Sequence, residues 1–139
     1  MKLPTEAQWE RAAQGKSKIY HQYPWGDQPP DGKIANSGYS GLGHASPVGM
    51  FPDDCTDEEV MDMGGNVWEW CRDWYQGDYY QQSPEEDPKG PEKGESRVIR
   101  GGSWVNNITW NFRCAYRDYI LPDDRGFGLG FRVVCSAQF

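Results

Sequence analysis

Apolar residues recur at helical spacing only near the start of the chain. Trp9 and Ala13 lie four residues apart, which places them on one face of a helix. Thr5 is a favourable N-cap, and Gln8 three residues later completes a capping box. The sequence therefore predicts a helix over Leu3–Gly15, whose last residue is a glycine suited to end it.

Short alternating or continuous apolar stretches in the second half of the chain predict strands. They cover Asn66–Tyr75, Arg97–Trp104, Arg113–Tyr119 and Gly130–Cys135. Residues 17–52 and 77–96 are rich in Gly, Pro and polar residues, which is typical of long loops. The pattern predicts an α+β domain with a small antiparallel sheet, few helices and much loop.

One segment, Val105 to Leu129, fits neither a helical nor a strand period. It carries large side chains, such as Trp110, Tyr119 and Phe127, among Asn, Asp, Gly and Pro. Side chains of this size can form a core, or they can form a surface that contacts a partner. Periodicity alone leaves both interpretations open.

Composition and charge narrow the class of protein. The 139 residues fit one domain, and 14% aromatic residues against 37% hydrophobic residues predict a core of a few large rings. The net charge of −7, without a basic stripe, argues against nucleic-acid binding. No apolar run is long enough to span a membrane, and no signal peptide is visible at the N-terminus, so we expect a cytoplasmic location.

The four cysteines form no pair at zinc-ligand spacing. They are too few for a disulfide scaffold, so the favoured interpretation is reduced, partly buried thiols. A single bridge between Cys71 and Cys135, which both end strand-like segments, is the alternative.

Seven short motifs appear in order along the chain. They are LPTEAQWERAA, YPWGD, AN, PVGMFP, MGGNVWEWCRDWY, RVIRGGSW and GFRVV. Together they resemble the formylglycine-generating-enzyme/sulfatase-modifying-factor domain, whose fold is similar to that of C-type lectins. The resemblance implies a single domain over residues 1–139 that lacks the usual N-terminal portion of the family domain. A sheet edge left open in this way can pair with another chain.

The resemblance also bears on catalysis. Catalytic members of the family hold copper between two cysteines shortly after the GGS motif, whereas Asn106 and Trp110 stand at those positions here. Copper(I) requires soft thiolate ligands. A second branch, the iron-dependent sulfoxide synthases, takes its metal ligands from a His-rich domain, and this chain has only His21 and His44. We therefore expect no copper, no iron and no catalytic residues.

Another subset of the family comprises the variable proteins of diversity-generating retroelements. There, a reverse transcriptase rewrites the 3′ end of the gene by mutating template adenines, and the GGSW start, spaced arginines and GFRV end of this chain resemble that frame. Mutating the adenines of an Asn codon cannot give Lys, Glu, Gln or Met, and none of these occurs over residues 105–129. Trp110 lies outside the Asn-derived set, but an AGG arginine codon would reach it.

The diversified interpretation divides residues 105–129 into two kinds of position. Fixed residues would hold the fold, with Trp104 and Phe131 in the core and Arg113, Arg117 and Arg125 in hydrogen-bond networks. The residues between them would face solvent and bind a protein or another macromolecule. This predicted variable set comprises Val105, Asn107, Ile108, Thr109, Trp110, Asn111, Tyr116, Asp118, Tyr119, Ile120, Leu121, Asp123, Asp124, Gly126, Phe127, Gly128 and Leu129, with Phe112 as a further candidate that fits a core position better.

The stretch DMGGNVWE resembles a calcium-binding stretch of the family. The implied ligands are the Asp62 side chain, the Gly65 and Val67 carbonyls and the Glu69 carboxylate. These are the hard oxygen ligands that calcium prefers, and the ion would be structural. The alternative is that Glu69 accepts hydrogen bonds from a neighbouring arginine and that the turn needs no metal.

Three functions follow from these patterns. The first is a non-catalytic, diversified ligand-binding domain. The second is an undiversified accessory or signalling domain of the same family. The third, which the absent cysteine pair opposes, is an oxidase of the formylglycine-generating or sulfoxide-synthase type. The sequence names neither the target nor the oligomeric state.

Overall fold

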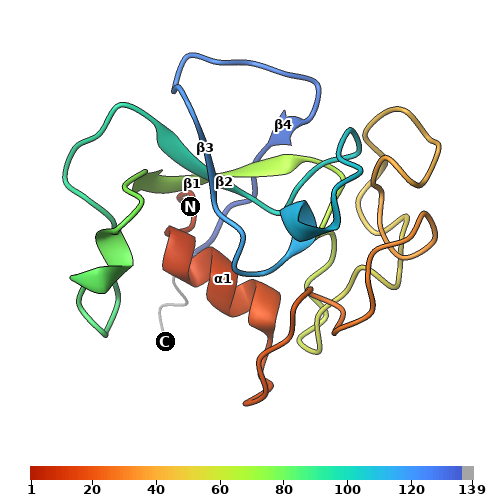
Figure 1. The fold of residues 1–139 in the computed structure, drawn as a ribbon, viewed down its shortest axis with the longest axis horizontal. Coiled ribbons are helices and arrows are strands. Elements are labelled where there is room, and N and C mark those ends of the chain that lie inside the picture. Colours follow the sequence, from red (N-terminus) through yellow and green to blue (C-terminus); the bar gives the residue numbers. More distant parts are fainter. Residues whose placement is uncertain (136–139) are drawn as a thin grey trace.

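The computed structural model describes residues 1–135. Its elements are α1 (Glu6–Gln14), β1 (Trp68–Trp74), the 3₁₀ helix η1 (Tyr79–Gln81), β2 (Arg97–Arg100), the 3₁₀ helix η2 (Thr109–Phe112), β3 (Asp118–Ile120) and β4 (Leu129–Gly130). The predicted α+β class with long loops is confirmed, and α1 lies against one side of a small curled sheet (Figure 1). Within the described part of the chain, no helix combines the length and apolar character needed to cross a membrane.

The sheet has the strand order β3-β2-β1-β4. β2 pairs antiparallel with both β1 and β3, whereas β4 pairs parallel with β1, with Trp68 opposite Leu129. The predicted all-antiparallel sheet is therefore wrong at one edge. Since β3 and β4 run in the same direction at opposite edges, their connection must cross the sheet, and residues 121–128 form the loop that arches between them in Figure 1.

The third predicted strand, Arg113–Tyr119, begins later than expected. β3 starts only at Asp118. The carbonyls of Cys114 and Tyr116 accept hydrogen bonds from the Arg100 guanidinium, at 2.7 and 2.9 Å, rather than from a neighbouring strand. Over this stretch, the Arg100 side chain therefore supplies hydrogen bonds that a neighbouring strand would otherwise supply.

Two further predicted strands, Arg97–Trp104 and Gly130–Cys135, are shorter than predicted. β2 ends at Arg100 because Gly101 and Gly102 follow with φ values of 96° and 77°, which turn the chain out of the sheet. β4 covers two residues, and over residues 131–135 the chain forms only an isolated bridge, between Val134 and Lys2.

Helix α1 begins as its sequence predicts. The Thr5 hydroxyl accepts from the Gln8 amide at 3.1 Å, and the Gln8 side chain accepts from the Thr5 amide at 3.0 Å. The Asp73 carboxylate of β1 accepts from the Glu6 amide at 2.8 Å, which fixes the helix start against the sheet. Burial raises the pKa of this Asp73 carboxyl group.

The core lies between α1 and the sheet. Its buried members are Trp9, Ala13, Met63, Cys71, Val98 and Cys114. The core positions predicted for Trp104 and Phe131 are wrong, because Trp104 is half-buried and Phe131 is 67% exposed. Phe131 follows the two-residue edge strand β4, so no further strand covers it.

All four cysteines are free thiols. Cys71 and Cys114 are buried, Cys55 is half-buried and Cys135 is exposed. The alternative Cys71–Cys135 bridge is therefore not formed. Burial raises the pKa of the Cys114 thiol to about 12, so it stays protonated at neutral pH.

Candidate binding surface

The structure places nearly all of the predicted variable set at the surface. Its exposed members are Val105, Asn107, Ile108, Trp110, Tyr119, Leu121, Asp123, Asp124, Gly126 and Phe127, and its half-buried members are Thr109, Tyr116, Asp118, Ile120, Gly128 and Leu129. Phe127 is 94% exposed and Trp110 51% exposed, although both are large apolar residues. Exposed apolar side chains of this kind make the segment the candidate binding surface.

Asn111 and Phe112 do not belong to this surface. Asn111 is buried, and Phe112 is completely buried. The tight turn of η2 directs these two residues inward while Trp110 points outward. The Phe112 ring also fills the space beside Gly102, where an added β-carbon would lie 2.8 Å from the ring. The prediction that Asn111 is a surface residue is therefore wrong, and the core assignment of Phe112 is confirmed.

Most of the exposed side chains come from two loops, the loop after β2 and the loop between β3 and β4. The two loops meet at Trp104. Its indole nitrogen donates to the Phe127 carbonyl at 3.2 Å. A β-carbon added to Gly128 would contact Ser103 at 3.0 Å and Val105 at 3.9 Å. The loop after β2 and the loop between β3 and β4 thus lie side by side.

Hydrogen bonds to their backbone groups hold these loops in place. The Trp68 amide donates to the Gly128 carbonyl at 2.7 Å, and the Gln22 carbonyl accepts from the Cys114 amide at 2.8 Å. β3 is held by its ladder with β2. Backbone groups are present whatever the side chain. The support of the loops is therefore largely independent of the residues displayed on them.

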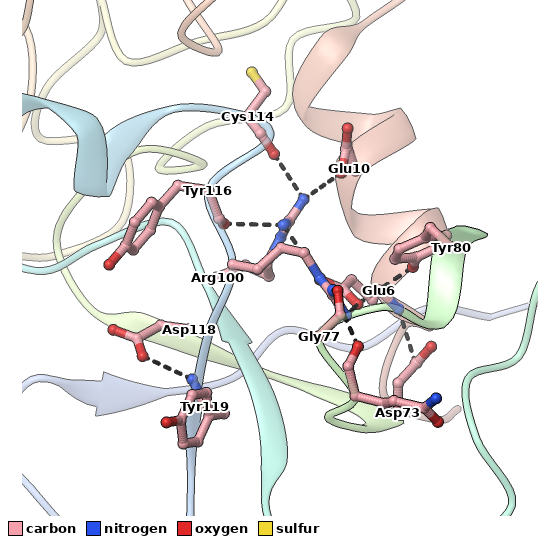
Figure 2. A network of polar contacts seen from close by, with 12 residues as sticks. Glu6, Glu10, Asp73, Gly77, Tyr80, Arg100, Cys114, Tyr116, Asp118 and Tyr119 are labelled. Atoms are coloured by element: carbon pink, nitrogen blue, oxygen red, sulfur yellow. Dashed lines mark hydrogen bonds and ion pairs between the residues drawn. The ribbon is translucent and has the colours of Figure 1, made fainter. Parts of the chain in front are cut away.

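Arg100 is the centre of this support (Figure 2). Its side chain is fully buried and forms ion pairs with Glu6 at 3.2 Å and Glu10 at 2.5 Å. The same guanidinium donates to the carbonyls of Cys114 and Tyr116. Helix α1, strand β2 and the segment before β3 are thus joined through one side chain.

Only one of the three arginines predicted in networks takes part in one. Arg117 bonds both carboxylate oxygens of Glu6, at 2.8 and 3.0 Å. Arg113 and Arg125 are exposed, and their side chains make no hydrogen bond within residues 1–135, so those two predictions are wrong.

Sequence reasoning missed Arg100, although the chain carried a signal for it. Arg100 follows two apolar residues at the end of a strand, and Glu6 and Glu10 lie one helical turn apart on the same face of the predicted helix. Two acidic residues on the inner face of a helix need a buried cation as a partner.

In the predicted calcium stretch, Glu69 forms a partly buried ion pair with Arg132. Glu69 accepts from Arg132 through both oxygens, at 2.6 and 2.8 Å, and from the Trp9 indole at 2.7 Å. The Asp62 carboxylate accepts from the Gly49 amide at 2.7 Å. Both predicted carboxylate ligands therefore already hold hydrogen-bond donors.

Within the described residues, no group of three or more His, Cys, Asp or Glu side chains is placed to hold a metal ion. Gly65 and Val67, whose carbonyls complete the predicted set, lie in the turn before β1. The geometry matches the alternative in which a neighbouring arginine binds Glu69.

Comparison with known proteins identifies the family. The model of the sulfatase-modifying factor enzyme 1-like domain matches residues 1–137. The chain belongs to this family. The predicted resemblance to the formylglycine-generating-enzyme domain is thereby confirmed.

Individual relatives differ in overall organisation. The chain is 37% identical over 149 residues to the formylglycine-generating enzyme of Streptomyces coelicolor. This alignment covers 99% of this chain and 47% of the relative. It is 40% identical over 133 residues to the serine/threonine-protein kinase Pkn1 of Chlamydia trachomatis, covering 94% of this chain and 20% of the kinase. The family domain therefore occurs in proteins of very different size.

Among solved structures, the chain is similar to Treponema denticola variable protein 1. The TM-score is 0.81 at 32% identity, covering 94% of this chain and 45% of that one. The chain thus spans about half the length of this structure and of the curated enzyme it matches. The likeness confirms the fold and the predicted resemblance to variable proteins.

Arg100→Ala is expected to lower the free energy of unfolding by about 3–5 kcal/mol, because it leaves buried carboxylate groups without their cation. Urea unfolding monitored by tryptophan fluorescence measures the change. Arg113→Ala, at an exposed arginine, is the matched control and should shift stability by about 0.5 kcal/mol or less. Equal effects of the two substitutions would contradict the assigned network.

Phe112→Ala is expected to cost about 3–5 kcal/mol through loss of a fully buried ring. Phe127→Ala, at a ring 94% exposed, should change stability by about 0.5 kcal/mol or less. Thermal unfolding of both variants measures the contrast. A large loss at Phe127 would show that the displayed side chains are part of the fold.

Proposed function

We propose that this domain is a non-catalytic ligand-binding module whose segment 105–129 presents a diversified surface to a protein or another macromolecule. The observation that carries the proposal is the separation of roles within this segment. Except for Asn111, the residues of the variable set are exposed or half-buried, while the framework binds the segment mainly through its backbone. Such an arrangement lets side chains change without loss of the fold.

The chemistry of the exposed residues supports binding of a macromolecule. Trp110, Tyr119 and Phe127 offer large rigid contact areas at low cost in conformational entropy. Asp123 and Asp124 lie exposed in the same segment and add negative charge. A partner with apolar and basic groups on its surface complements this combination.

The likeness to Treponema denticola variable protein 1 supports the diversified form of the proposal. The absence of Lys, Glu, Gln and Met over residues 105–129 agrees with adenine-directed mutation of Asn codons. Both the residue content and the fold are thus those expected of a variable protein.

The proposal excludes the copper oxidase activity of the family. Asn106 and Trp110 occupy the positions where the resemblance places a cysteine pair. Cys114, which follows them, is fully buried with a raised pKa and hence no exposed thiolate. A pair of soft ligands is therefore not available on this surface.

A second candidate is an undiversified accessory domain. The match to about a fifth of a protein kinase favours it, because there the family domain accompanies a much larger chain. Such a domain would use the same surface with a fixed set of side chains for one partner.

The DNA beside the gene distinguishes these two candidates. For a diversified protein, we expect a near-copy of the codons for residues 101–134 that differs almost only at adenines, next to a reverse transcriptase gene. Sequencing the locus in several isolates should show substitutions confined to the variable set, with Phe112 and Arg117 unchanged. Differences spread over all bases would reject diversification and leave the accessory domain.

Calcium binding at Asp62–Glu69 stays a prediction. In this structure, calcium would compete with Arg132 for the Glu69 carboxylate. A calcium ion at Glu69 must displace the Arg132 guanidinium. We therefore expect calcium to raise the melting temperature of Arg132→Ala more than that of the unmodified chain, and Glu69→Gln to abolish both responses. Thermal unfolding with calcium and with a chelator measures this, and no response in any variant would reject the site.

A further inference from the structure

A loop from the first half of the chain lies against the binding surface. The Gly38 amide donates to the Asn106 carbonyl at 2.7 Å, and the Tyr39 hydroxyl donates to the Asn107 carbonyl. Both acceptors are backbone groups of the loop that follows β2. Residues 37–40 lie outside the segment predicted to vary, so this contact is a constant feature beside a variable one.

Gly38 allows the two loops to approach each other closely. A β-carbon at this position would lie 2.9 Å from the Asn106 carbonyl oxygen and 3.2 Å from the Asn107 β-carbon. Since a β-carbon essentially never comes within 3.0 Å of another heavy atom, any other residue would push the loops apart. The short distance between the two loops therefore depends on a glycine at position 38.

The base of this constant loop is rigid. Asn36 and Ser37 are each 1% exposed. The Asn36 carbonyl accepts from the Asn66 amide at 2.8 Å, and the Asn36 side-chain amide donates to the His44 carbonyl at 3.0 Å. A loop held at its base in this way can position another loop without itself being displaced.

The Tyr39 ring remains accessible while its hydroxyl is engaged. The residue is 47% exposed, and its hydroxyl contacts Asn107, which directly precedes the exposed Ile108 in the chain. An exposed ring at this place extends the aromatic surface beyond the variable segment. It would meet the same partner as the variable side chains.

We infer that Gly38 and Tyr39 form a constant clamp that positions the backbone of residues 105–108 and adds a fixed aromatic contact to the binding surface. The contact role rests on the proposed function, whereas the positioning role does not. A loop whose side chains vary cannot rely on them to set its conformation. A clamp on two of its carbonyls presets that conformation and lowers the ordering cost of binding.

The positioning role is tested by amide hydrogen exchange of the full chain. Tyr39→Phe removes only the hydroxyl and should speed exchange about fivefold at the amides of residues 106–110, without a change in melting temperature. Gly38→Ala should have a larger local effect. Tyr20→Phe, at another exposed tyrosine, and Gly77→Ala, where a β-carbon meets only the Tyr75 hydroxyl at 3.8 Å, are the matched controls. Exchange unchanged from these controls would overturn the clamp.

The contact role is tested with a defined target. A library that randomises the exposed members of the variable set is selected for binding to hen lysozyme, a basic protein. In the selected binders, Tyr39→Phe should raise the dissociation rate about fivefold, and Tyr39→Ala should raise it further. Binders indifferent to both substitutions would overturn the contact role. Failure to obtain any binder would instead count against the proposed function, while the exchange experiment would still decide the clamp.

Discussion

The buried guanidinium of Arg100 is the interaction on which the arrangement of this domain depends. A charged group in the interior is costly unless it is paired and hydrogen-bonded, and here it meets two carboxylates of α1 and two backbone carbonyls. Because these partners come from different parts of the chain, the guanidinium fixes their relative positions. Neither the short strands nor the nine-residue helix could do so alone.

The use of backbone carbonyls as hydrogen-bond acceptors explains how this small domain can hold exposed apolar residues over 105–129. The sheet has few residues, and the segment before β3 is held by a side chain in place of a strand. Carbonyls serve as acceptors for Arg100, Trp104 and Tyr39 alike. The positions of these loops therefore depend largely on backbone atoms common to all residues, so the exposed side chains can change with little effect on the fold.

A second, partly buried ion pair joins Glu69 and Arg132 at the other edge of the sheet. Glu69 follows the start of β1 and Arg132 follows β4, so the pair closes the parallel edge of the sheet. The Trp9 indole donates to the same carboxylate and links it to the core. Two arginine–glutamate pairs thus stand at the two places where regular backbone pairing is shortest.

Local sequence determined much of the fold. The capping box and the apolar face of α1, the strand around Cys71 and the long loops all follow from neighbouring residues, because their energies depend on contacts a few positions apart. The surface character of residues 105–129 followed from their resemblance to a diversified segment, because periodicity alone left core and surface both open. The family motifs indicated the domain as a whole, as the match over residues 1–137 confirms.

Only the tertiary structure decided which residues of that segment face inward and which arginines support it. The sequence predicted Asn111 as a surface residue and Arg113 and Arg125 as network members. The turn of η2 buries Asn111, and both arginines are exposed. Arg100, Arg132 and the clamp of Gly38 and Tyr39 act on groups 14 to 94 positions away. Contacts over such separations leave no periodic trace in the chain, because they arise only when the elements have packed.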